Sequence, residues 1–344
     1  MLALAADESR ERPSWTERVL APTTVPVKVV IPGGSGQVGQ ILARRFAGRG
    51  DDVVVLARGG SVPAGRAVAW DGRTLGPWAK EFDGADVVIN LAGRSVNCRY
   101  TEANLRAMFD SRVASTQVVG AAIAAVEHPP KVWLQMSTAT IYAHRFDAAN
   151  TESSGILGGQ EPGVPAYWSR SVNIAKAWEI ALEEAKTPHT RKVALRTAMV
   201  MSPDKGGIFD VMLTLVRRGL GGSAGDGRQF VSWIHGADLA RAIDFLIARD
   251  DVAGPVNLAA PGPLPYRDFM RTLREVWGAR VGLPAAKWML EIGAWAMRTD
   301  TELVLKSRRV VPERLLGAGF RFDFEDWATA ARDLVARHRR LGGG

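Results

Sequence analysis

The sequence predicts an α/β fold in which a parallel sheet carries helices on both faces and a smaller, mainly helical lobe follows. Three observations support this prediction. Short β-rich runs alternate with longer amphipathic segments from residue 27 onward, a pattern typical of parallel sheets. A glycine-rich turn joins the first predicted strand to the first predicted helix. After about residue 260 the strand signal becomes thin and helical segments dominate.

The elements follow one another in a regular order. The predicted strands span residues 27–31, 53–56, 87–91, 132–136 and 193–195. Between them, residues 38–49, 101–126 and 167–186 place apolar side chains at helical spacing. In the C-terminal lobe the same spacing predicts helices at 266–277, 284–297 and 324–338.

Two smaller features accompany these elements. In the lobe, Trp288, Ile292 and Trp295 fall on one helical stripe that we expect to pack against the rest of the lobe. A further helix is expected at 239–248, with Asp238 as its N-cap.

The pattern divides the chain into three parts. Residues 1–26 form an N-terminal extension, and residues 27–204 form a nucleotide-binding domain to which 230–258 return. Residues 259–344, with the loop 205–229, form a C-terminal lobe on the substrate side. Five glycines between Gly219 and Gly227 lack the ending of a phosphate-binding P-loop, so we expect a mobile loop over the site.

Composition limits the classes of protein. Hydrophobic residues make up 47% and charged residues 23% of the chain, as in folded globular proteins. No apolar stretch reaches the ~18 residues that a bilayer crossing needs. Residues 1–26 lack the apolar core of a secretory signal, so we expect a cytoplasmic protein without a membrane partner. Cys98 is the only cysteine, which excludes intramolecular disulfides and cysteine-based zinc sites, and we expect no metal site.

The net charge is basic but the basic residues are dispersed. Lysine and arginine number 44 against 36 acidic residues, a formal charge of +8. No known nucleic-acid module accompanies them, so we do not expect a nucleic-acid partner. The tightest basic groups, which we expect to be solvated, are Arg217 with Arg218, Lys306 with Arg308 and Arg309, and Arg337 with Arg339 and Arg340.

The strongest local signal is a GxxGxxG turn that directly follows the first predicted strand and opens a helix. Glycines allow the tight turn and the close approach of the backbone to a diphosphate, and the free N–H groups of the helix start can bind the anion. The sequence therefore predicts a dinucleotide site in a Rossmann-type doubly wound sheet. The residues of this predicted phosphate-binding turn are Gly33, Ser35, Gly36, Gln37, Val38 and Gly39.

The end of the second predicted strand indicates which dinucleotide binds. An acidic residue there would accept hydrogen bonds from the ribose 2′-hydroxyl of NAD and repel a 2′-phosphate. Residues 56–62 contain no acid but contain Arg58, whose guanidinium could pair with that phosphate, aided by Ser61. We therefore expect NADP as the cofactor. The alternative is that Arg58 simply points to solvent.

A longer set of motifs, over roughly residues 27–338, resembles the extended short-chain dehydrogenase/reductase (SDR) superfamily. The match is to its atypical epimerase-like branch, of the NAD-dependent epimerase/dehydratase type, which has its own C-terminal domain. Beyond the glycine turn, the matching residues are Trp70-Asp71, 90–93, Ser111-Arg112, Trp178-Glu179, 195–197, 202–207, 225–229, 232–235 and 311–320.

The resemblance implies roles for several residues. Asp71 would contact the adenine amino group and Met199 would lie near the nicotinamide. From the residues alone, Asp71 could equally cap a turn in its Asp-Gly pair, and 90–93 could be an ordinary strand end. The full set that the resemblance places at the cofactor is Asp71, Leu91, Ala92, Gly93, Ser137, Lys176 and Met199.

The proton-transfer tyrosine of typical SDR enzymes is missing. In those enzymes a lysine four residues after the tyrosine shares its helix face and acidifies the phenol. None of the four tyrosines here has such a lysine. Lys176 occupies a plausible place, but Val172 stands four residues before it. Thr138 matches the usual Ser/Thr position. The candidate substitutes for the tyrosine are Tyr167, which we rank first, Tyr142 and His235.

These observations predict an NADP(H)-dependent oxidoreductase or epimerase-like enzyme that acts on a small carbonyl or hydroxyl substrate. Thr138 would polarise the substrate oxygen, Lys176 would hold the cofactor ribose, and Tyr167 would stand in for the missing acid. The alternative is an NADP-loaded regulatory or partner-binding protein that has lost proton transfer. A homodimer is compatible with the sequence.

Overall fold

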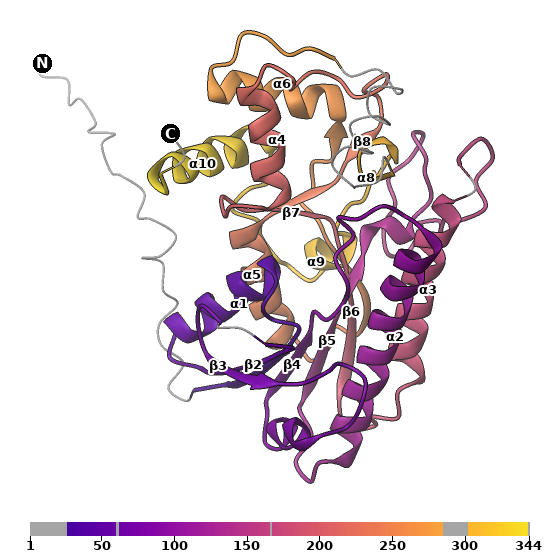
Figure 1. The fold of residues 1–344 in the computed structure, drawn as a ribbon, viewed down its shortest axis with the longest axis vertical. Helices are drawn as coiled ribbons and strands as arrows, with labels where there is room; N and C mark the ends of the chain where they lie inside the picture. Colours follow the sequence, from indigo (N-terminus) through magenta and orange to yellow (C-terminus); the bar gives the residue numbers. More distant parts are fainter. Residues whose placement is uncertain (1–25, 60–61, 166, 285–301, 343–344) are drawn as a thin grey trace, which may run out of the picture.

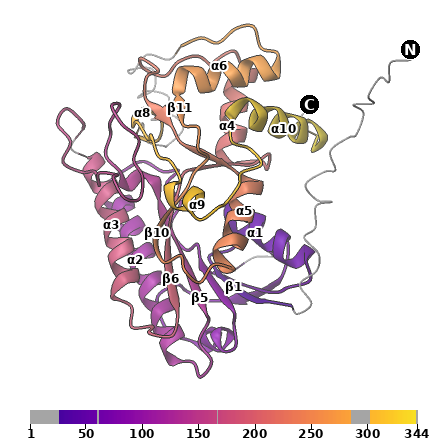
Figure 2. The same ribbon diagram turned by 180° about the vertical axis from the view of Figure 1, so that it is seen from behind.

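The computed structural model describes residues 26–59, 62–165, 167–284 and 302–342. The N-terminal extension almost entirely, Ser61, and the expected stripe of Trp288, Ile292 and Trp295 lie outside the described residues. The views in Figures 1 and 2 show a sheet with its helices at one end of the molecule and a second group of helices, α4, α6 and α10, at the other.

The sheet has seven strands in the order β10-β6-β5-β4-β1-β2-β3, and every pairing is parallel. The strand order reverses beside β1, whose Val29 pairs with Val53 of β2 on one side and Val87 of β4 on the other. This confirms the predicted doubly wound α/β fold. The strands are β1 (Lys28–Pro32), β2 (Asp52–Ala57), β3 (Arg66–Ala69), β4 (Val87–Asn90), β5 (Val132–Thr138), β6 (Arg191–Thr197) and β10 (Gly254–Leu258).

Helices cover both faces of the sheet. The helices α1 (Gln37–Gly48) and α5 (Gly236–Ile247) pack on one face, and α2 (Glu102–Ala125) and α3 (Trp168–Glu184) on the other (Figures 1 and 2). Each face of the sheet has its own apolar core. Alternate residues of β1 are buried in one core or the other, because neighbouring side chains of a strand point to opposite faces. Val29 and Ile31 belong to the core under α1 and α5, and Val30 to the core under α2.

The second group of elements has its own apolar core. Its helices α4 (Ile208–Arg217), α6 (Tyr266–Trp277) and α10 (Trp327–Arg340) contribute to one cluster of buried side chains. Trp327 stacks on Phe269 at 3.8 Å between ring centroids and meets Trp233 edge-on at 5.2 Å. The predicted helices at 266–277 and 324–338 are confirmed, the second beginning at Trp327.

The structure also contains shorter elements. The remaining ones are the 3-10 helices η1 (Pro77–Phe82) and η2 (Ala139–Ile141), the strands β7 (Met199–Met201), β8 (Phe230–Val231), β9 (Trp233–His235) and β11 (Leu264–Pro265), and the helices α8 (Glu302–Leu305) and α9 (Glu313–Gly317). Within the described ranges, no helix is both long and apolar enough to span a bilayer.

The expectation that Asp238 caps its helix is wrong. The helix α5 begins directly after β9, and the N-cap is His235, whose Nδ1 accepts a hydrogen bond from the Ala237 amide at 3.1 Å. Asp238 lies inside the first turn, fully buried, and its carboxylate accepts the amides of Asp323 and Phe324 at 2.8 and 2.9 Å. Asp238 therefore attaches the C-terminal segment to α5.

Candidate functional site

The glycine turn connects the ends of three neighbouring strands. Gly33 follows β1 with φ +74°, a conformation that L side chains rarely adopt, and its amide donates to the carbonyl of Leu56 at 2.8 Å. A Cβ at Gly33 would lie 2.6 Å from the Cα of Ala92. The turn thus packs directly on the chain that leaves β4.

The other two glycines of the motif have different surroundings. A Cβ at Gly39 would overlap the backbone of Gly34, so Gly39 lets the helix pack against the turn. A Cβ at Gly36 would meet only the carbonyl of Gly33, at 4.0 Å. Gly36 is exposed and is the N-cap of α1, which has no side-chain cap. The first amides of α1 therefore face open space, where the backbone can approach an anion.

Three other residues of the turn lie around that space. Ser35 is exposed and Val38 is half-buried. Gln37 lies against Gly207, and its buried Nε2 has no hydrogen-bond acceptor within the described part of the chain. A buried amide donor without an acceptor is costly, so this atom fits a site whose acceptor comes from a ligand. The turn therefore fits a dinucleotide diphosphate.

Arg58 lies just past the end of β2 and is exposed. No carboxylate of the described residues forms an ion pair with it. Since β2 neighbours β1, the guanidinium is on the strand next to the glycine turn, where the 2′-phosphate of NADP would be read. The role of Arg58 stays a prediction.

Asp71 caps its own turn. Its Oδ1 accepts the amides of Arg73 and Thr74 at 2.8 and 2.9 Å, and its Oδ2 accepts the Thr74 hydroxyl at 2.5 Å. These hydrogen bonds lower the pKa of Asp71 to about 2. The geometry is that of the turn-capping alternative, and contact with an adenine stays a prediction.

The chain leaving β4 has the shape expected for a cofactor wall. Leu91 is half-buried, Ala92 is buried and Gly93 is exposed. The side chain of Asn90 fixes this bend, because its Oδ1 accepts the Ala92 amide at 3.1 Å while its Nδ2 donates to Gln135 on the neighbouring strand at 2.9 Å. Met199 opens β7, half-buried.

The end of β5 carries two hydroxyls with different partners. Ser137 donates to Oε1 of Glu179 at 2.6 Å, and Glu179 in turn holds Arg196 through two hydrogen bonds of 2.9 and 2.8 Å. The Thr138 hydroxyl accepts the amide of Thr140 at 3.2 Å. No described acceptor takes the Thr138 hydroxyl hydrogen, so this hydroxyl can donate to a ligand.

The helix α3 places Lys176 without a tyrosine beside it. Lys176 donates from Nζ to the carbonyl of Gly158 at 2.8 Å. Val172, four residues earlier, is fully buried, and a Cβ at Gly159 would lie 3.4 Å from it. The chain at 158–159 thus covers the position of the SDR tyrosine. Tyr167 is the half-buried N-cap residue of α3.

The other two candidate substitutes are structural. Tyr142 is 2% exposed, and its hydroxyl donates to Asn257 and accepts from Arg196, both at 2.9 Å. Burial raises the pKa of Tyr142 despite the neighbouring guanidinium. His235, besides capping α5, is bonded through Nε2 to Asp333 at 3.1 Å. These hydrogen bonds favour structural roles for Tyr142 and His235.

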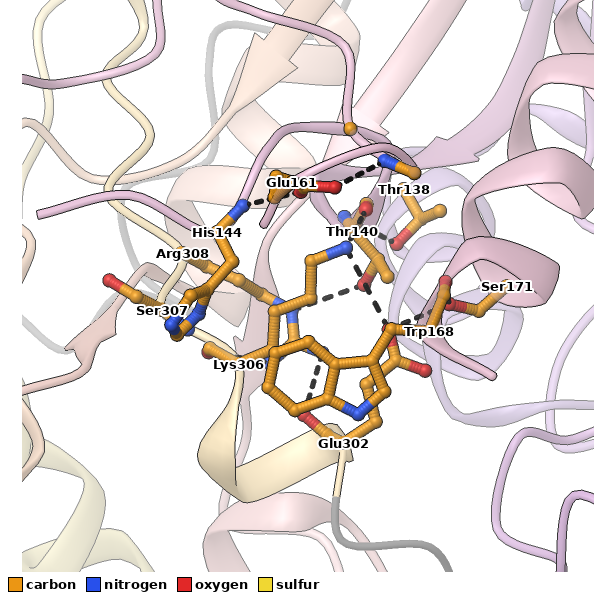
Figure 3. A network of polar contacts seen from close by, with 12 residues as sticks. Thr138, Thr140, His144, Glu161, Trp168, Ser171, Glu302, Lys306, Ser307 and Arg308 are labelled. Atoms are coloured by element: carbon orange, nitrogen blue, oxygen red, sulfur yellow. Dashed lines mark hydrogen bonds and ion pairs between the residues drawn. The ribbon is translucent and has the colours of Figure 1, made fainter. Parts of the chain in front are cut away.

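A network of polar side chains from the C-terminal segment closes against this site (Figure 3). Lys306 donates to the carbonyl of Thr140 at 2.9 Å and lies 3.7 Å from the carboxylate of Glu302. Arg308 donates to the Thr140 hydroxyl at 3.1 Å, and Ser171 of α3 donates to Glu302 at 2.6 Å. Burial lowers the pKa of Lys306 to about 8.

The expectation that this basic group is solvated is wrong, because Lys306 and Arg308 are 2% and 7% exposed. Their partners include Thr140, which is distant in the sequence. The only local signal is the spacing of Glu302 and Lys306, which places opposite charges one helical turn apart.

The same network reaches the chain that covers α3. His144 accepts the amide of Ser307 at 2.8 Å, and Glu161 accepts the amides of His144 and Gly159 at 2.7 and 2.6 Å. The segment 302–310 is therefore bonded both to the turn after β5 and to the loop before α3.

A parallel sheet in this strand order, with a glycine turn where the order reverses, defines a doubly wound, Rossmann-like α/β protein. Residues 29–259 match the family model for the NAD dependent epimerase/dehydratase family, and the chain belongs to that family. Residues 285–334 match a domain of unknown function, DUF1731.

Similar proteins extend over nearly the whole chain. The human epimerase family protein SDR39U1 is 29% identical over 315 residues, which are 90% of this chain and 100% of that protein. An epimerase family protein of Staphylococcus epidermidis is 30% identical over 308 residues, 90% of this chain and 99% of its own.

Solved structures of similar proteins also match nearly the whole chain. The crystal structure of human SDR39U1 (isoform 2) with NADPH has a TM-score of 0.77 at 27% identity and covers 90% of this chain and 99% of its own. The nucleoside-diphosphate sugar epimerase from Corynebacterium glutamicum has a TM-score of 0.70 at 26% identity, covering 93% of this chain and 62% of its own.

Proposed function

We propose that this chain is an NADP(H)-dependent, epimerase-like oxidoreductase of the cytoplasm that acts on a small carbonyl or hydroxyl compound. The observation that carries the proposal is the open approach at Gly36, beside the uncapped start of α1. The exposed Arg58 on the next strand supports NADP over NAD. The similarity to a protein crystallised with NADPH supports the same cofactor.

Different residues bind the cofactor and the substrate. The amides of the glycine turn bind the diphosphate, and Arg58 binds the 2′-phosphate. Thr138 donates its free hydroxyl hydrogen to the substrate oxygen. Lys176 uses one N–H on the carbonyl of Gly158 and has two more for the cofactor ribose. When bound, the cofactor supplies or accepts the hydride.

Proton transfer is the step in which this protein differs from typical SDR enzymes. The chain at 158–159 covers Val172, so the donor has to come from elsewhere. Tyr167 begins the same helix as Lys176 and is half-buried. We assign the donor role to Tyr167 as part of this proposal.

The experiment is turnover of NADPH with a panel of aldehydes and ketones. We expect a carbonyl substrate to be found, Thr138→Ala and Tyr167→Phe to lower kcat by about 10²-fold or more, and NADPH affinity to stay within twofold. The matched control is Tyr266→Phe, a buried tyrosine of the other group of helices. Unchanged kcat in both site variants contradicts the assigned roles.

A second function is favoured by one observation. The fully buried Val172 leaves Lys176 without the tyrosine that it would acidify. An NADP-loaded regulatory or partner-binding protein would keep nucleotide binding and need no such pair. NADPH binding without turnover of any carbonyl compound supports this function and overturns the first.

A further inference from the structure

One arginine near the site is held in place, and no described residue supplies a counter-ion for it. Arg112, in α2, has its guanidinium between Gly93 and the ring of Trp178. A Cβ at Gly93 would lie 3.4 Å from the Cγ and Cζ atoms of Arg112, and Cζ is 4.9 Å from the centroid of the Trp178 ring. The guanidinium is therefore in contact with the backbone at Gly93 and with the Trp178 ring.

Among the described residues, the positive charge of Arg112 has no acidic partner. Nη1 donates to the carbonyl of Met108, one turn earlier in the same helix, at 3.1 Å. No carboxylate of the described residues lies within ion-pair distance, and the polar side chains that bear on the charge are those of Tyr100 and Cys98. Burial lowers the pKa of Arg112 to about 10. A desolvated charge without a partner is expensive, and a guanidinium has five N–H donors to satisfy.

The indole N–H of Trp178 is a second donor in this region, and no described residue accepts its hydrogen bond. The Nε1 of Trp178 is buried, and no hydrogen-bond acceptor reaches it in the part of the chain that the structure describes. Trp178 comes from α3 and Arg112 from α2. Two neighbouring helices thus bring a guanidinium and an indole N–H close together, with the Arg112 Cζ 4.9 Å from the Trp178 ring centroid. Within the described residues, the indole N–H and most N–H groups of the guanidinium have no acceptor.

These donors come from helices on the other face of the sheet from the start of α1. The glycine turn and Arg58 lie at the ends of β1 and β2, and α1 starts on the opposite face of the sheet from α2 and α3 (Figure 1). Gly93 follows β4, which pairs with β5, the strand that ends at Thr138. Because β4 also pairs with β1, an anion at Arg112 would lie between the glycine turn and Thr138.

We propose that Arg112, together with the indole N–H of Trp178, binds an oxyanion of the substrate, a carboxylate or a phosphate. A planar guanidinium fork matches either group through two N–H donors. The inference rests on the function proposed above and adds to it the substrate class: a small carbonyl or hydroxyl compound that carries a negative charge.

The test is an NMR titration of the protein labelled with ¹⁵N at its tryptophan indoles, at constant ionic strength set by chloride. Trp178→Phe identifies the Nε1–H resonance of Trp178. We expect inorganic phosphate, malonate or both to shift that resonance saturably, in nucleotide-free and NADP-loaded protein. A phosphate response alone indicates a phosphate substrate, and a malonate response alone indicates a carboxylate. No saturable shift with either anion overturns the proposal.

Variants separate anion binding from folding and from cofactor binding. Arg112→Met should weaken anion binding at least tenfold and leave NADPH affinity within twofold. Trp178→Phe keeps the aromatic face under the guanidinium but removes the indole N–H. We expect this variant to bind the anion several-fold more weakly, as measured by calorimetry with the same anion. The matched control is Arg94→Gln, an exposed arginine of the loop after β4 that bonds Asn104.

The outcomes distinguish this inference from the proposed function. If Arg112→Met weakens the binding of NADPH and leaves the binding of the anions unchanged, the arginine binds the cofactor and the inference is overturned. If the wild-type protein binds the anions at Trp178 but binds no NADPH, the proposed function fails while the anion site stands, and the anion is then no substrate of an NADP enzyme.

Discussion

Gly36→Ala should separate cofactor binding from folding. The backbone at Gly36 has φ −75° and ψ 173°, which alanine adopts without strain. The added methyl would meet one protein atom, at 4.0 Å. Alanine is a poorer N-cap than glycine by about 0.5–1 kcal/mol, and the reduced entropy of the unfolded chain offsets about 0.4–1 kcal/mol. The free energy of unfolding should therefore change by less than ~1 kcal/mol.

Binding should change much more. The methyl would occupy the space through which a diphosphate reaches the amides of α1. Loss of one hydrogen bond to a charged group costs about 1.5–3 kcal/mol, so we expect NADPH to bind about 10- to 150-fold more weakly. The assays are calorimetric titration with NADPH and unfolding in urea.

Two other glycines are matched controls. Gly48→Ala, at the far end of α1 with open space around it, should leave NADPH affinity unchanged and raise the free energy of unfolding by about 0.5–1 kcal/mol. Gly39→Ala should lower the free energy of unfolding by at least about 1–3 kcal/mol, because its Cβ overlaps the backbone of Gly34. A folded Gly36→Ala protein that binds NADPH as tightly as the wild type would refute the role of this turn.

Four further outcomes are expected. Arg58→Gln should weaken the binding of NADPH about tenfold and leave the binding of NADH unchanged, because only NADPH carries the 2′-phosphate. Calorimetry with both nucleotides measures these affinities. Asp238→Ala should lower the free energy of unfolding in urea by about 2–4 kcal/mol, since it leaves two backbone amides without their acceptor. Burial alone would raise the pKa of Asp333, but hydrogen bonds from His235 and an arginine outweigh it and lower that pKa to about 2. Asp333 should therefore stabilise the fold by about 2 kcal/mol above pH ~4, lost as the pH falls toward 2, and Asp333→Asn should flatten the acid side of the stability profile. Val172→Tyr should destabilise the protein by about 1–3 kcal/mol and add no activity, because the chain at 159 covers that position.

Each of these outcomes can fail. Equal loss of NADPH and NADH affinity in the Arg58 variant would place the guanidinium elsewhere. A stable Asp238 variant would mean that the C-terminal segment does not depend on its contact with α5. An unchanged acid profile in the Asp333 variant would contradict the lowered pKa. New carbonyl reductase activity in the Val172 variant would show that the loop before α3 yields.

Local patterns predict those parts of the fold that depend on neighbouring residues. The buried strands β1, β2, β4, β5 and β6 are runs of apolar residues, and the sequence predicts them. The sequence does not predict β3, whose residues are largely exposed at the sheet edge. It also does not predict β10, the opposite edge strand, which contains a glycine and a proline.

In the site, too, the sequence predicts the features that depend on neighbouring residues and not those that depend on residues far apart in the chain. The glycine turn is local, and the structure has the strand, turn and helix that are predicted from the placement of the glycines. The partners of Asp238 and Lys306 include residues far along the chain, Asp323 and Thr140. Spacing cannot show such partners, so Asp238 was expected to cap a helix and Lys306 to face water. Arg112 belongs to a recognised motif, but only the packing of α2 on α3 shows that no carboxylate of the described residues pairs with it.

Calorimetric titration of the nucleotide-free protein with NADPH and with NADH tests the central claim most directly. The account predicts one binding site per chain with a clear preference for NADPH. Absence of heat with both nucleotides, or tighter binding of NADH, would contradict it.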